Sequence, residues 1–392
     1  MACDTGLLAQ LADAFGRDFR RACRRIDRLA GHPVNPLAGE QVSDCLFGEL
    51  GIHPTRLTKT QKHYTTQDKY LKARRLEHAI VPLIIEARQL NKYIGTYVAK
   101  LPAMLRDGRY HAHWKYTRTA TGRLAEEIIL LIPKHTARGK EIRNAFHATD
   151  GHTLVSVDLS QIELRTMAHL SRDPVLLGVY QRGEDLHAAV AHALLGAPKR
   201  REDQDESLHR LPIKTYHFSL INGTTEYGLL DQFHELGLLS WDLEQVREMQ
   251  AAWWKLHAGV GEYWERQKAA ARKHGYVRDL FGRRRYLYAI HSTSEQVRRE
   301  AERQCLCPIQ ATADGISKRW NIRILQHVLR PRWREGRRYC EPWVRVHDDT
   351  TLEVDTRIAR TVRQEMLALV PQLLCIPTTA EGKMGERWGS LH

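Results

Sequence analysis

Long apolar runs are absent from this 392-residue chain, because no stretch of about 18 apolar residues occurs anywhere in it. The sequence therefore predicts no membrane span. The first apolar stretch contains Asp4 and Asp13, and charges at such positions are wrong for a secretory signal peptide. Internal repeats and low-complexity tracts are also missing, which argues against a solenoid or a disordered linker. A globular protein in a reducing cytoplasm is the expected class.

Cysteine is scarce, and its spacing is not that of a zinc site. The chain contains seven cysteines, an odd number. Cys305 and Cys307 form a Cys-x-Cys pair, but no second pair follows at a spacing typical of zinc ligands. We interpret the cysteines as buried or free thiols.

Acidic residues are outnumbered by basic ones. The chain has 60 Lys and Arg against 46 Asp and Glu, which gives a formal charge of +14 and a pI near 9.5. Polyanions are the natural partners of such a surface, and nucleic acid is the first of these. The alternative is a generally basic protein without a polyanionic ligand. Hydrophobic residues make up 42% of the chain, enough for the cores of two or three structural units.

The first third of the chain is predicted to be helical. Residues 5–30 and 77–101 both have apolar residues at intervals of three to four, the spacing of an amphipathic helix. A basic stretch at 59–75 precedes the second helix. This stretch is either a solvated face or a clamp on a phosphate backbone, and the pattern alone leaves both open.

A strand predicted over Thr153–Asp158 is followed at once by a helical pattern, so Asp158 lies where the strand ends. A second strand is predicted over Trp343–Val354, and it contains Asp348 and Asp349. A hairpin turn at these acids is disfavoured, since such turns usually contain Gly or Asn. If Asp158 and Asp348 meet on adjacent strands, their carboxylates can share two divalent ions about 3.5–4 Å apart.

Cationic and aromatic residues recur every four positions between these strands. Arg210, Lys214 and Phe218 would share one face of a helix, with Pro212 in its first turn. Two cations followed by a ring would fit a triphosphate followed by a base. A surface helix with basic residues is the alternative. A hairpin is predicted over 275–288, GYVRDLFGRRRYLY.

Five motifs, in order, resemble those of the family A DNA polymerases, the group that includes bacterial DNA polymerase I. They are TRTATGRLA (117–125), VSVDLSQIELRTMAHLSRD (155–173) with GEDLH (183–187), RLPIKTYHFSLINGTTEYGL (210–229), PIQATADGISK (308–318) and VRVHDDTTLEV (344–354). The ending TAEGKMGERW is similar to the phage-type branch.

The resemblance implies an α+β fold shaped like a right hand, with an antiparallel-sheet palm, helical fingers and a helical thumb. The thumb and N-terminal helices would span 1–110, and the fingers 171–294. The palm would be split into 110–170 and 295–392. No proofreading exonuclease is expected, because these parts use nearly every residue.

For the catalytic centre, the resemblance implies Asp158, the backbone carbonyl of Leu159 and Asp348 as ligands of two Mg²⁺, with Mn²⁺ as an alternative. Asp349 would be a secondary acid near the primer terminus. His347 would support the primer end rather than bind metal.

For the incoming deoxynucleoside triphosphate, the resemblance implies that His187, Arg210 and Lys214 bind the phosphates. Lys214 could also donate a proton to the departing pyrophosphate, since a cation beside a developing oxyanion is stabilising. Phe218 would pack on the nucleotide, and Asn222 stands in the same pocket.

Sugar and template contacts are implied at five further positions. Glu163 would be the barrier to a 2′-hydroxyl, and Gln161 would line the same pocket. Arg123 and Gln310 would touch the minor-groove side of the terminal base pairs, where acceptors are similar for every correct pair. Arg303 is the candidate for the family's DNA-binding arginine, although the chain is one residue short before Pro308.

The chain departs from the family pattern around the DNA. Asn222 stands where the pattern has Tyr, Ser219 where it has Gly, and Asp349 where it has Glu. The segment AEEIILLIP (125–133) replaces an Asn-Leu-Gln element. Because the Tyr ring helps to shape the base pair, we expect reduced fidelity, altered sugar selection or tolerance of lesions.

These observations predict a template-directed DNA polymerase that extends the primer of a primer-template DNA. Its place would be the cytoplasm, at the nucleoid or at a site of phage or plasmid replication, in DNA replication or repair. One rival is a single-subunit RNA polymerase-like enzyme, and Glu163 argues against it. The other is a catalytically weak or inactive DNA-binding accessory protein of the same fold. A processivity or exonuclease partner cannot be identified from the sequence.

Overall fold

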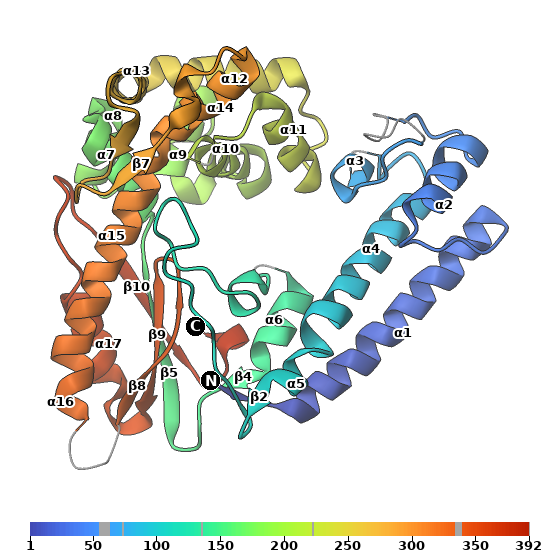
Figure 1. Cartoon of the computed structure of the whole chain (residues 1–392), viewed down its shortest axis with the longest axis horizontal. Helices are drawn as coiled ribbons and strands as arrows, with labels where there is room; N and C mark the ends of the chain where they lie inside the picture. The colour runs from blue at the N-terminus through green and yellow to red at the C-terminus, as the bar shows by residue number, and fades with distance from the viewer. Residues whose placement is uncertain (55–62, 73, 135, 222, 334–338, 392) are drawn as a thin grey trace. The chain divides into compact units, whose positions relative to one another are not determined.

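The computed structural model describes residues 1–54, 63–72, 74–134, 136–221, 223–333 and 339–391. In the part of the chain that it describes, no helix is both long and apolar enough to cross a membrane. The chain divides into two compact units (Figure 1). The first comprises Met1–His111, Leu131–His147 and Leu230–Trp241, and the second Ala112–Leu130, Ala148–Leu229 and Asp242–His392.

Two long helices, α1 (Thr5–Ala30) and α4 (Ile80–Tyr93), lie side by side in the first unit (Figure 1). Helix α1 begins where the Asp4 side chain accepts a hydrogen bond from a backbone N–H of the first turn, and it ends at Gly31 with φ of 81°. Helix α4 continues as a π-helical turn, η2 (Ile94–Val98). Both predicted helices are confirmed.

Short elements complete the first unit. A small sheet has the order β2-β3-β1-β4, all pairs antiparallel. The bounds are β1 (Ala2–Cys3), β2 (Leu105–Arg106), β3 (Arg109–Tyr110), β4 (Phe146–His147), α2 (Gly39–Ser43), η1 (Asp44–Glu49), α3 (Asp68–Lys72), α5 (Leu101–Met104) and α6 (Ala137–Asn144). Part of the predicted basic stretch, 59–62, lies outside the described residues.

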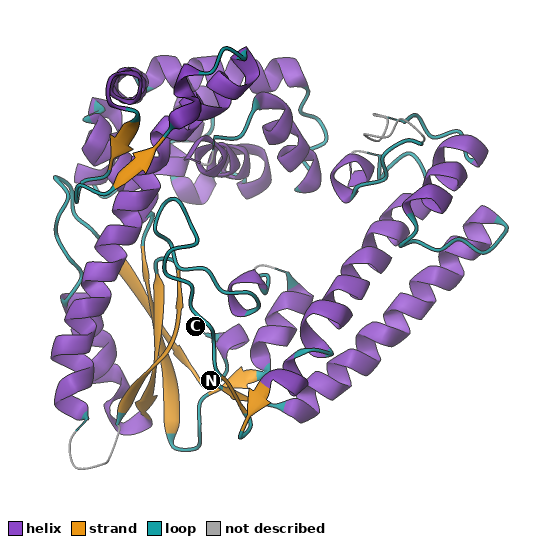
Figure 2. Ribbon diagram, viewed as in Figure 1, coloured by secondary structure: helices purple, strands orange, loops and turns teal. Residues whose placement is uncertain are grey.

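A four-stranded antiparallel sheet forms the centre of the second unit (Figure 2). Its order is β10 (Ala380–Gly385), β5 (His152–Leu159), β9 (Asp349–Asp355) and β8 (Cys340–Val346). Strand β5 pairs along its length with β9 on one side and β10 on the other. The order explains how residues distant in sequence meet, because β5 comes before the largely helical region 162–332, and β8, β9 and β10 come after it.

The two faces of this sheet differ in chemistry. Val155 and Val157 of β5 pack in one hydrophobic core with Trp320 of α15 (Cys307–Ile324) and Met366 of α17 (Ala359–Ala368). Side chains alternate along a strand. The even-numbered residues of β5, Asp158 among them, therefore point away from that core.

The hairpin between β8 and β9 corrects the prediction of one continuous strand over Trp343–Val354. The two strands pair through Val346 and Asp349, so His347 and Asp348 form a tight turn. Neither Gly nor Asn is needed, because His347 itself adopts a φ of 58°. Its carbonyl accepts hydrogen bonds from Ser317 Oγ and Arg345 Nε, both at 3.1 Å. The contact with Ser317 of α15 (Cys307–Ile324) is tertiary, and it stabilises a turn that local sequence preferences do not indicate.

Helices fill the sequence between β5 and β8. They are α7 (Ile162–Ser171), α8 (Pro174–Gln181), α9 (Leu186–Leu195), η5 (Glu206–Arg210), α10 (Leu211–Ile221), α11 (Glu226–Glu235), α12 (Leu243–Leu256), α13 (Ala258–His274), α14 (Glu295–Arg303), η8 (Leu325–Leu329) and α16 (Arg330–Arg332). The predicted hairpin is confirmed as β6 (Tyr276–Arg278) and β7 (Arg284–Tyr286).

Candidate active site

The end of the central sheet brings acidic residues together. Asp158, near the end of β5, is directly opposite Asp349 on β9. The backbone N–H of Leu159 donates to the carbonyl of Asp348 at 3.2 Å, so the turn that holds Asp348 is attached to the end of β5. Asp158, Leu159 and Asp348 all line one cavity of about 450 Å³. The two acids predicted to meet therefore do so.

The charge of Asp348 is held in an unfavourable environment. Burial and the nearby carboxylate of Asp158 raise its pKa from 3.8 to about 6, and the guanidinium of Arg123 only partly opposes them. A divalent cation between the carboxylates would remove this repulsion. Among the described residues, no group of three or more His, Cys, Asp or Glu forms a complete metal site. Two carboxylates still suit Mg²⁺, which usually completes its shell with phosphate oxygens and water.

Asp349 is directed along the sheet surface. Its Oδ1 accepts hydrogen bonds from Ser156 Oγ at 2.5 Å and Thr351 Oγ1 at 3.3 Å. On the other side of β5, Glu381 is paired in register with Asp158 and lines the same cavity. The sequence analysis missed Glu381, because only the pairing of β10 with β5 brings it to this site.

The remaining lining of the cavity is largely the predicted nucleotide site. It comprises Ser160, Gln161, Ile162, Glu163, Leu164, Asp185, His187, Arg201, Arg210, Lys214, Phe218 and Glu381. The helix predicted to carry Arg210, Lys214 and Phe218 is present: η5 ends at Arg210, and α10, which follows it directly, contains Lys214 and Phe218. Phe218 is 43% exposed, and its ring centroid lies 6.4 Å from that of His187.

Arg210 is already engaged by carboxylates. Its Nη2 lies 3.0 Å from Asp185 Oδ2, and its Nη1 lies 2.9 Å from Glu206 Oε1. Asp185 also caps α9 by accepting from the N–H of Ala188 at 2.9 Å, and it lies 3.5 Å from Arg201. A triphosphate bound by Arg210 would compete with these carboxylates. The sequence analysis missed Asp185, although an Asp directly before a helix is a common N-cap signal.

A chain of hydrogen bonds, here called the imidazole relay, links Trp253, His217 and His187. The indole N–H of Trp253 donates to His217 Nε2 at 2.9 Å, and His217 Nδ1 lies 2.9 Å from His187 Nδ1. Because an indole can only donate, His217 Nε2 is the acceptor, so the proton of the neutral ring is on Nδ1. His217 then donates to His187 Nδ1. This leaves His187 with its proton on Nε2, available as a donor.

Both imidazoles of the relay are neutral near pH 7. Burial, with further contributions from Arg210 and Lys214, lowers the pKa of His187 to about 4 despite the opposing charge of Asp185. Burial also lowers the pKa of His217 well below its usual range. His187 is therefore positioned as a neutral N–H donor beside two cations. The sequence analysis did not find this arrangement, because no spacing rule connects 187, 217 and 253.

Glu163, in the first turn of α7, forms an ion pair with Arg123. Burial lowers the pKa of Arg123, against the influence of Asp348 and Asp314. Gln161 precedes α7 with φ of 52°, and its Oε1 accepts from the hydroxyl of Tyr180 at 3.0 Å. The ion pair thus joins Glu163, predicted to contact the sugar, with Arg123, predicted to contact the base pair.

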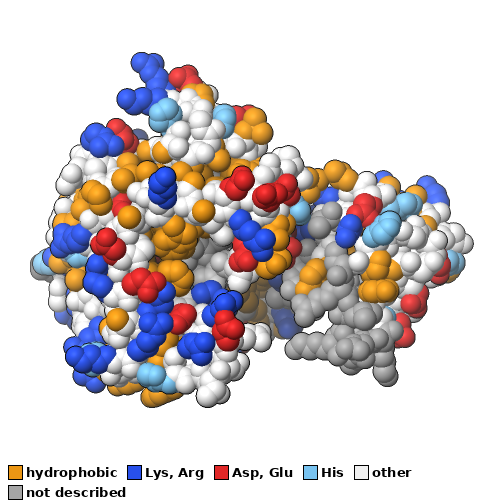
Figure 3. All heavy atoms as spheres, turned by 90° about the horizontal axis from the view of Figure 1, so that it is seen from above, with side chains coloured by type: hydrophobic (Ala, Val, Ile, Leu, Met, Phe, Trp, Pro, Cys, Tyr) orange, Lys and Arg blue, Asp and Glu red, His pale blue; other side chains and the backbone are white. Residues whose placement is uncertain are grey.

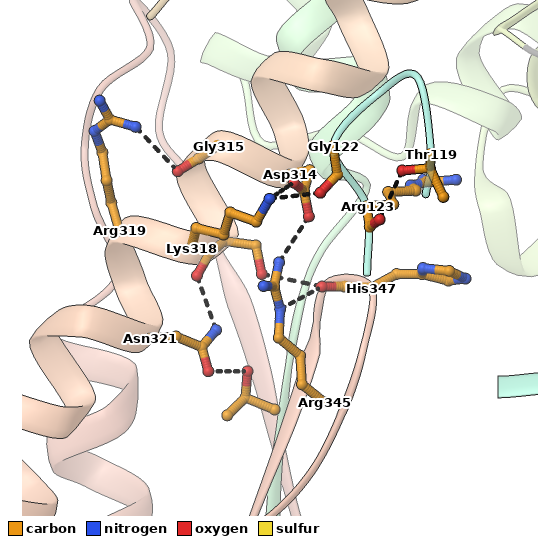
Figure 4. Close-up of polar contacts among 12 residues, drawn as sticks. Thr119, Gly122, Arg123, Asp314, Gly315, Lys318, Arg319, Asn321, Arg345 and His347 are labelled. Atoms are coloured by element: carbon orange, nitrogen blue, oxygen red, sulfur yellow. Dashed lines mark hydrogen bonds and ion pairs between the residues drawn. The ribbon is translucent and has the colours of Figure 1, made fainter. Parts of the chain in front are cut away.

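A buried carboxylate connects three segments next to this site (Figure 4). Asp314 of α15 lies 2.9 Å from Arg345 Nη2 of β8 and 2.8 Å from Lys318 Nζ. Lys318 also donates to the carbonyl of Gly122, directly before Arg123. Asp314 thereby holds Arg345, whose Nε supports the His347 turn. Asp314 belongs to the motif at 308–318, but only the tertiary contacts indicate this role.

Arg303, Gln310 and His347, which are predicted to contact DNA, are not among the described residues that line the cavity. Arg303, at the end of α14, forms an ion pair with Glu300, and Gln310 is half-buried in α15. Partial desolvation and the charges of Arg123 and Arg345 lower the pKa of His347. Asn222 lies outside the described residues. The predicted roles of these four residues stay predictions.

An antiparallel sheet that presents paired carboxylates beside Arg and Lys side chains is the arrangement expected of the class of nucleotide-polymerising folds. The family model "DNA polymerase family A" matches residues 5–390. The chain belongs to this family. The predicted α+β right-hand polymerase fold is confirmed, whereas the limits of thumb, fingers and palm stay a prediction.

The chain is similar to DNA polymerases of several bacteria. It is 33% identical over 395 residues to the thermostable DNA polymerase I of Thermus aquaticus, covering 98% of this chain and 45% of that protein. The identity with DNA polymerase I of Mycobacterium leprae is 32% over 403 residues, with 100% and 42% coverage. The chain thus spans less than half the length of these relatives.

A solved structure is also similar, the POL domain of Pol1 from M. smegmatis in complex with DNA primer-template and dNTP. Its TM-score is 0.86 at 31% identity, covering 100% of this chain and 67% of that one.

Proposed function

We propose that this chain catalyses template-directed DNA synthesis, adding deoxynucleotides to the 3′ end of a primer. The observation that supports this most directly is the cavity in which Asp158 and Asp348 face His187, Arg210 and Lys214. Acids that bind divalent ions and donors that bind phosphate are both required for nucleotidyl transfer. We extend to this chain the two ligands named for the M. smegmatis structure, a primer-template and a dNTP.

Asp158, Asp348 and the backbone carbonyl of Leu159 would hold two divalent ions, Mg²⁺ or Mn²⁺. When bound, such ions lower the pKa of an attacking hydroxyl and neutralise a leaving oxygen. The raised pKa of Asp348 is consistent with this assignment, because burial and the like charge of Asp158 both raise it, and a bound cation would offset both.

His187, Arg210 and Lys214 would bind the triphosphate. His187 offers a neutral N–H, so it can hold a phosphate oxygen without adding charge. Arg210 would exchange the carboxylates of Asp185 and Glu206 for phosphate. Lys214 would stabilise the charge that develops on pyrophosphate, and could transfer a proton to it.

Selection of the nucleotide would depend on Phe218, Glu163 and Gln161, which also line the cavity. Phe218 would pack on the nucleotide, and Glu163 with Gln161 would exclude a 2′-hydroxyl. The ion pair with Arg123 would hold Glu163 in place for this purpose. With Asn222 in the position of a shape-checking Tyr, we propose low fidelity or tolerance of lesions.

Contacts with the primer-template are proposed for the residues around this centre. Asp349 and His347 would lie near the primer terminus, and Arg123, Gln310 and Arg303 would contact the duplex or template. Net charge does not locate this surface, since basic side chains are spread among acidic and apolar ones on the face shown in Figure 3.

Primer extension with matched aspartate variants tests the proposal. The Asp158→Ala and Asp348→Ala variants should not extend the primer in Mg²⁺, but each should still bind DNA. Asp150→Ala is the control, because this exposed aspartate lies beyond the other end of β5. Normal extension by either cavity variant would refute the site. Binding without turnover by the unaltered chain would favour an accessory protein, and preference for ribonucleotides would favour an RNA polymerase.

A further inference from the structure

The hairpin β6–β7 has one buried face and one exposed face. Val277 and Leu287 are only 1% and 4% exposed and belong to a hydrophobic core. In the hairpin, Tyr276 pairs with Tyr286 and Arg278 pairs with Arg284. Because side chains alternate along a strand, these four point away from the buried face.

The exposed face is built of stacked rings and guanidinium groups. The rings of Tyr286 and Tyr288 are nearly parallel, at 10°, with centroids 5.7 Å apart. Tyr276 meets Tyr286 edge-on at 5.6 Å. The guanidinium carbons of Arg278 and Arg284 lie 5.0 Å and 4.9 Å from the centroid of the Tyr276 ring. We call these five residues the tyrosine platform.

Hairpin stability explains only part of this arrangement. Cross-strand aromatic pairs and cation–π contacts stabilise a two-stranded ribbon, which accounts for Tyr276, Tyr286 and the two arginines. Tyr288 lies beyond the last paired residue of β7 and is 80% exposed. Because the Tyr288 ring is mostly in solvent, it adds little buried apolar area to the fold. Its exposed surface can therefore accept a further flat ring.

We propose that the tyrosine platform binds the unpaired 5′ template strand ahead of the primer terminus. Bases would stack on Tyr288 and Tyr286, and Arg278 and Arg284 would contact the phosphates. Stacking on aromatic side chains is tolerant of sequence, because every base has a π face, and a basic surface beside the rings follows the backbone. This inference rests on the proposed function, which supplies the template.

The surroundings of the platform favour this occupant. Arg284, Tyr286 and Tyr288 line a concave region of about 940 Å³, together with Ala120 and Arg303. Ala120 belongs to the motif at 117–125, and Arg303 is a predicted DNA contact, so the platform borders the expected DNA path. Among the described residues that line this region, Glu300 is the one with a carboxylate, and it is paired with Arg303.

A single strand fits the platform better than the other ligands of the proposed reaction. The bases of a duplex are stacked on one another and hide their π faces, whereas unpaired bases expose them. The nucleotide cavity that contains Asp158 shares no lining residue with this region, so the incoming triphosphate is not the occupant.

Equilibrium binding to three primer-templates tests this inference by fluorescence anisotropy. They share one duplex and differ in the 5′ template overhang, which is a single nucleotide, ten nucleotides, or ten abasic residues. The unaltered chain should bind the ten-nucleotide overhang more tightly than the abasic one, on the order of tenfold. Tyr288→Ala and Tyr288→Leu should remove this difference, and Tyr288→Phe should retain it, because only the flat ring is needed.

The phosphate contacts have a different signature. Arg284→Ala should weaken binding of the base-bearing and the abasic ten-nucleotide overhangs alike, and leave the single-nucleotide overhang nearly unchanged. The inference is overturned if Tyr288→Ala binds all three as the unaltered chain does, or weakens all three equally.

Failure of this inference is distinguishable from failure of the proposed function. Tyr288→Ala should extend the primer with the single-nucleotide overhang at the rate of the unaltered chain. If the unaltered chain does not extend any primer, the proposed function is wrong, yet the binding comparison still reports on the platform. If primer extension is normal but the unaltered chain binds the base-bearing and the abasic ten-nucleotide overhangs with equal affinity, only the role of the tyrosine platform is refuted.

Discussion

Substitution Trp253→Phe tests the imidazole relay most directly. It removes the indole N–H that donates to His217 Nε2 and keeps an aromatic ring in the core. His217 is then free to carry its proton on Nε2 and to present a bare Nδ1 to His187. His187 would respond by moving its own proton to Nδ1, which turns an Nε2 lone pair toward the triphosphate.

The size of the effect follows from the hydrogen bond that is lost. A hydrogen bond to a charged group contributes about 1.5–3 kcal/mol, and each 1.4 kcal/mol is roughly a factor of ten. We expect KM for the deoxynucleotide to rise about tenfold or more. Because the proposed contact of His187 with the triphosphate would be the same in the substrate complex and in the transition state, kcat should change far less. The unsatisfied buried nitrogen of His217 should also reduce the free energy of unfolding by about 1–3 kcal/mol.

The assay is steady-state incorporation of a single nucleotide, with urea unfolding of each variant beside it. Trp254→Phe is the matched control, because this neighbouring tryptophan stacks on Trp264 at 5.4 Å and lies outside the relay. Ring ¹⁵N shifts of His187 report which nitrogen carries the proton. Equal KM values for folded Trp253→Phe and Trp254→Phe, or a proton on Nδ1 of His187 in the unaltered chain, would refute the reasoning.

Four further outcomes are expected. Because the pKa of Asp348 is raised to about 6, the folded state binds more protons than the unfolded state between about pH 4 and 6, so the free energy of unfolding falls as pH rises through that window. Above pH 6 and with metal ions chelated, Asp348→Asn should unfold at a higher urea concentration than the unaltered chain. Added Mg²⁺ should reverse that order. Asp185→Asn keeps an N-cap and releases Arg210, so KM for deoxynucleotide should fall roughly fivefold, and a rise would show instead that Asp185 positions Arg210. Asp314→Asn leaves the largely buried Arg345 without its carboxylate partner and should cost about 3 kcal/mol in urea unfolding, an expectation that a loss below about 1 kcal/mol would contradict. Asn222→Tyr should lower misincorporation, and unchanged error and ribonucleotide rates would reject the link to fidelity.

The sequence by itself determined the local elements and the kinds of chemistry. The alternation in β5 and the apolar spacing of α1 and α4 follow from residue order, because strand and helix periods act over a few residues. Asp158, Arg210, Lys214 and His187 were predicted as site residues through motifs in which spacing and residue type act together, and the structure places them along one cavity. Asp348 was predicted too, but the turn that holds it was not.

Only the tertiary structure decided which side chains contact one another and how those contacts set backbone conformation and protonation. The positive φ of His347 is tolerated because Ser317 and Arg345 bind its carbonyl; Ser317 comes from α15, and Asp314 of the same helix holds Arg345 in place. Glu381 reaches Asp158 through strand pairing. The protons of the relay depend on an indole far away in sequence. Hydrogen-bond direction, burial and like-charge proximity are properties of atoms in space, and no interval along the chain determines them.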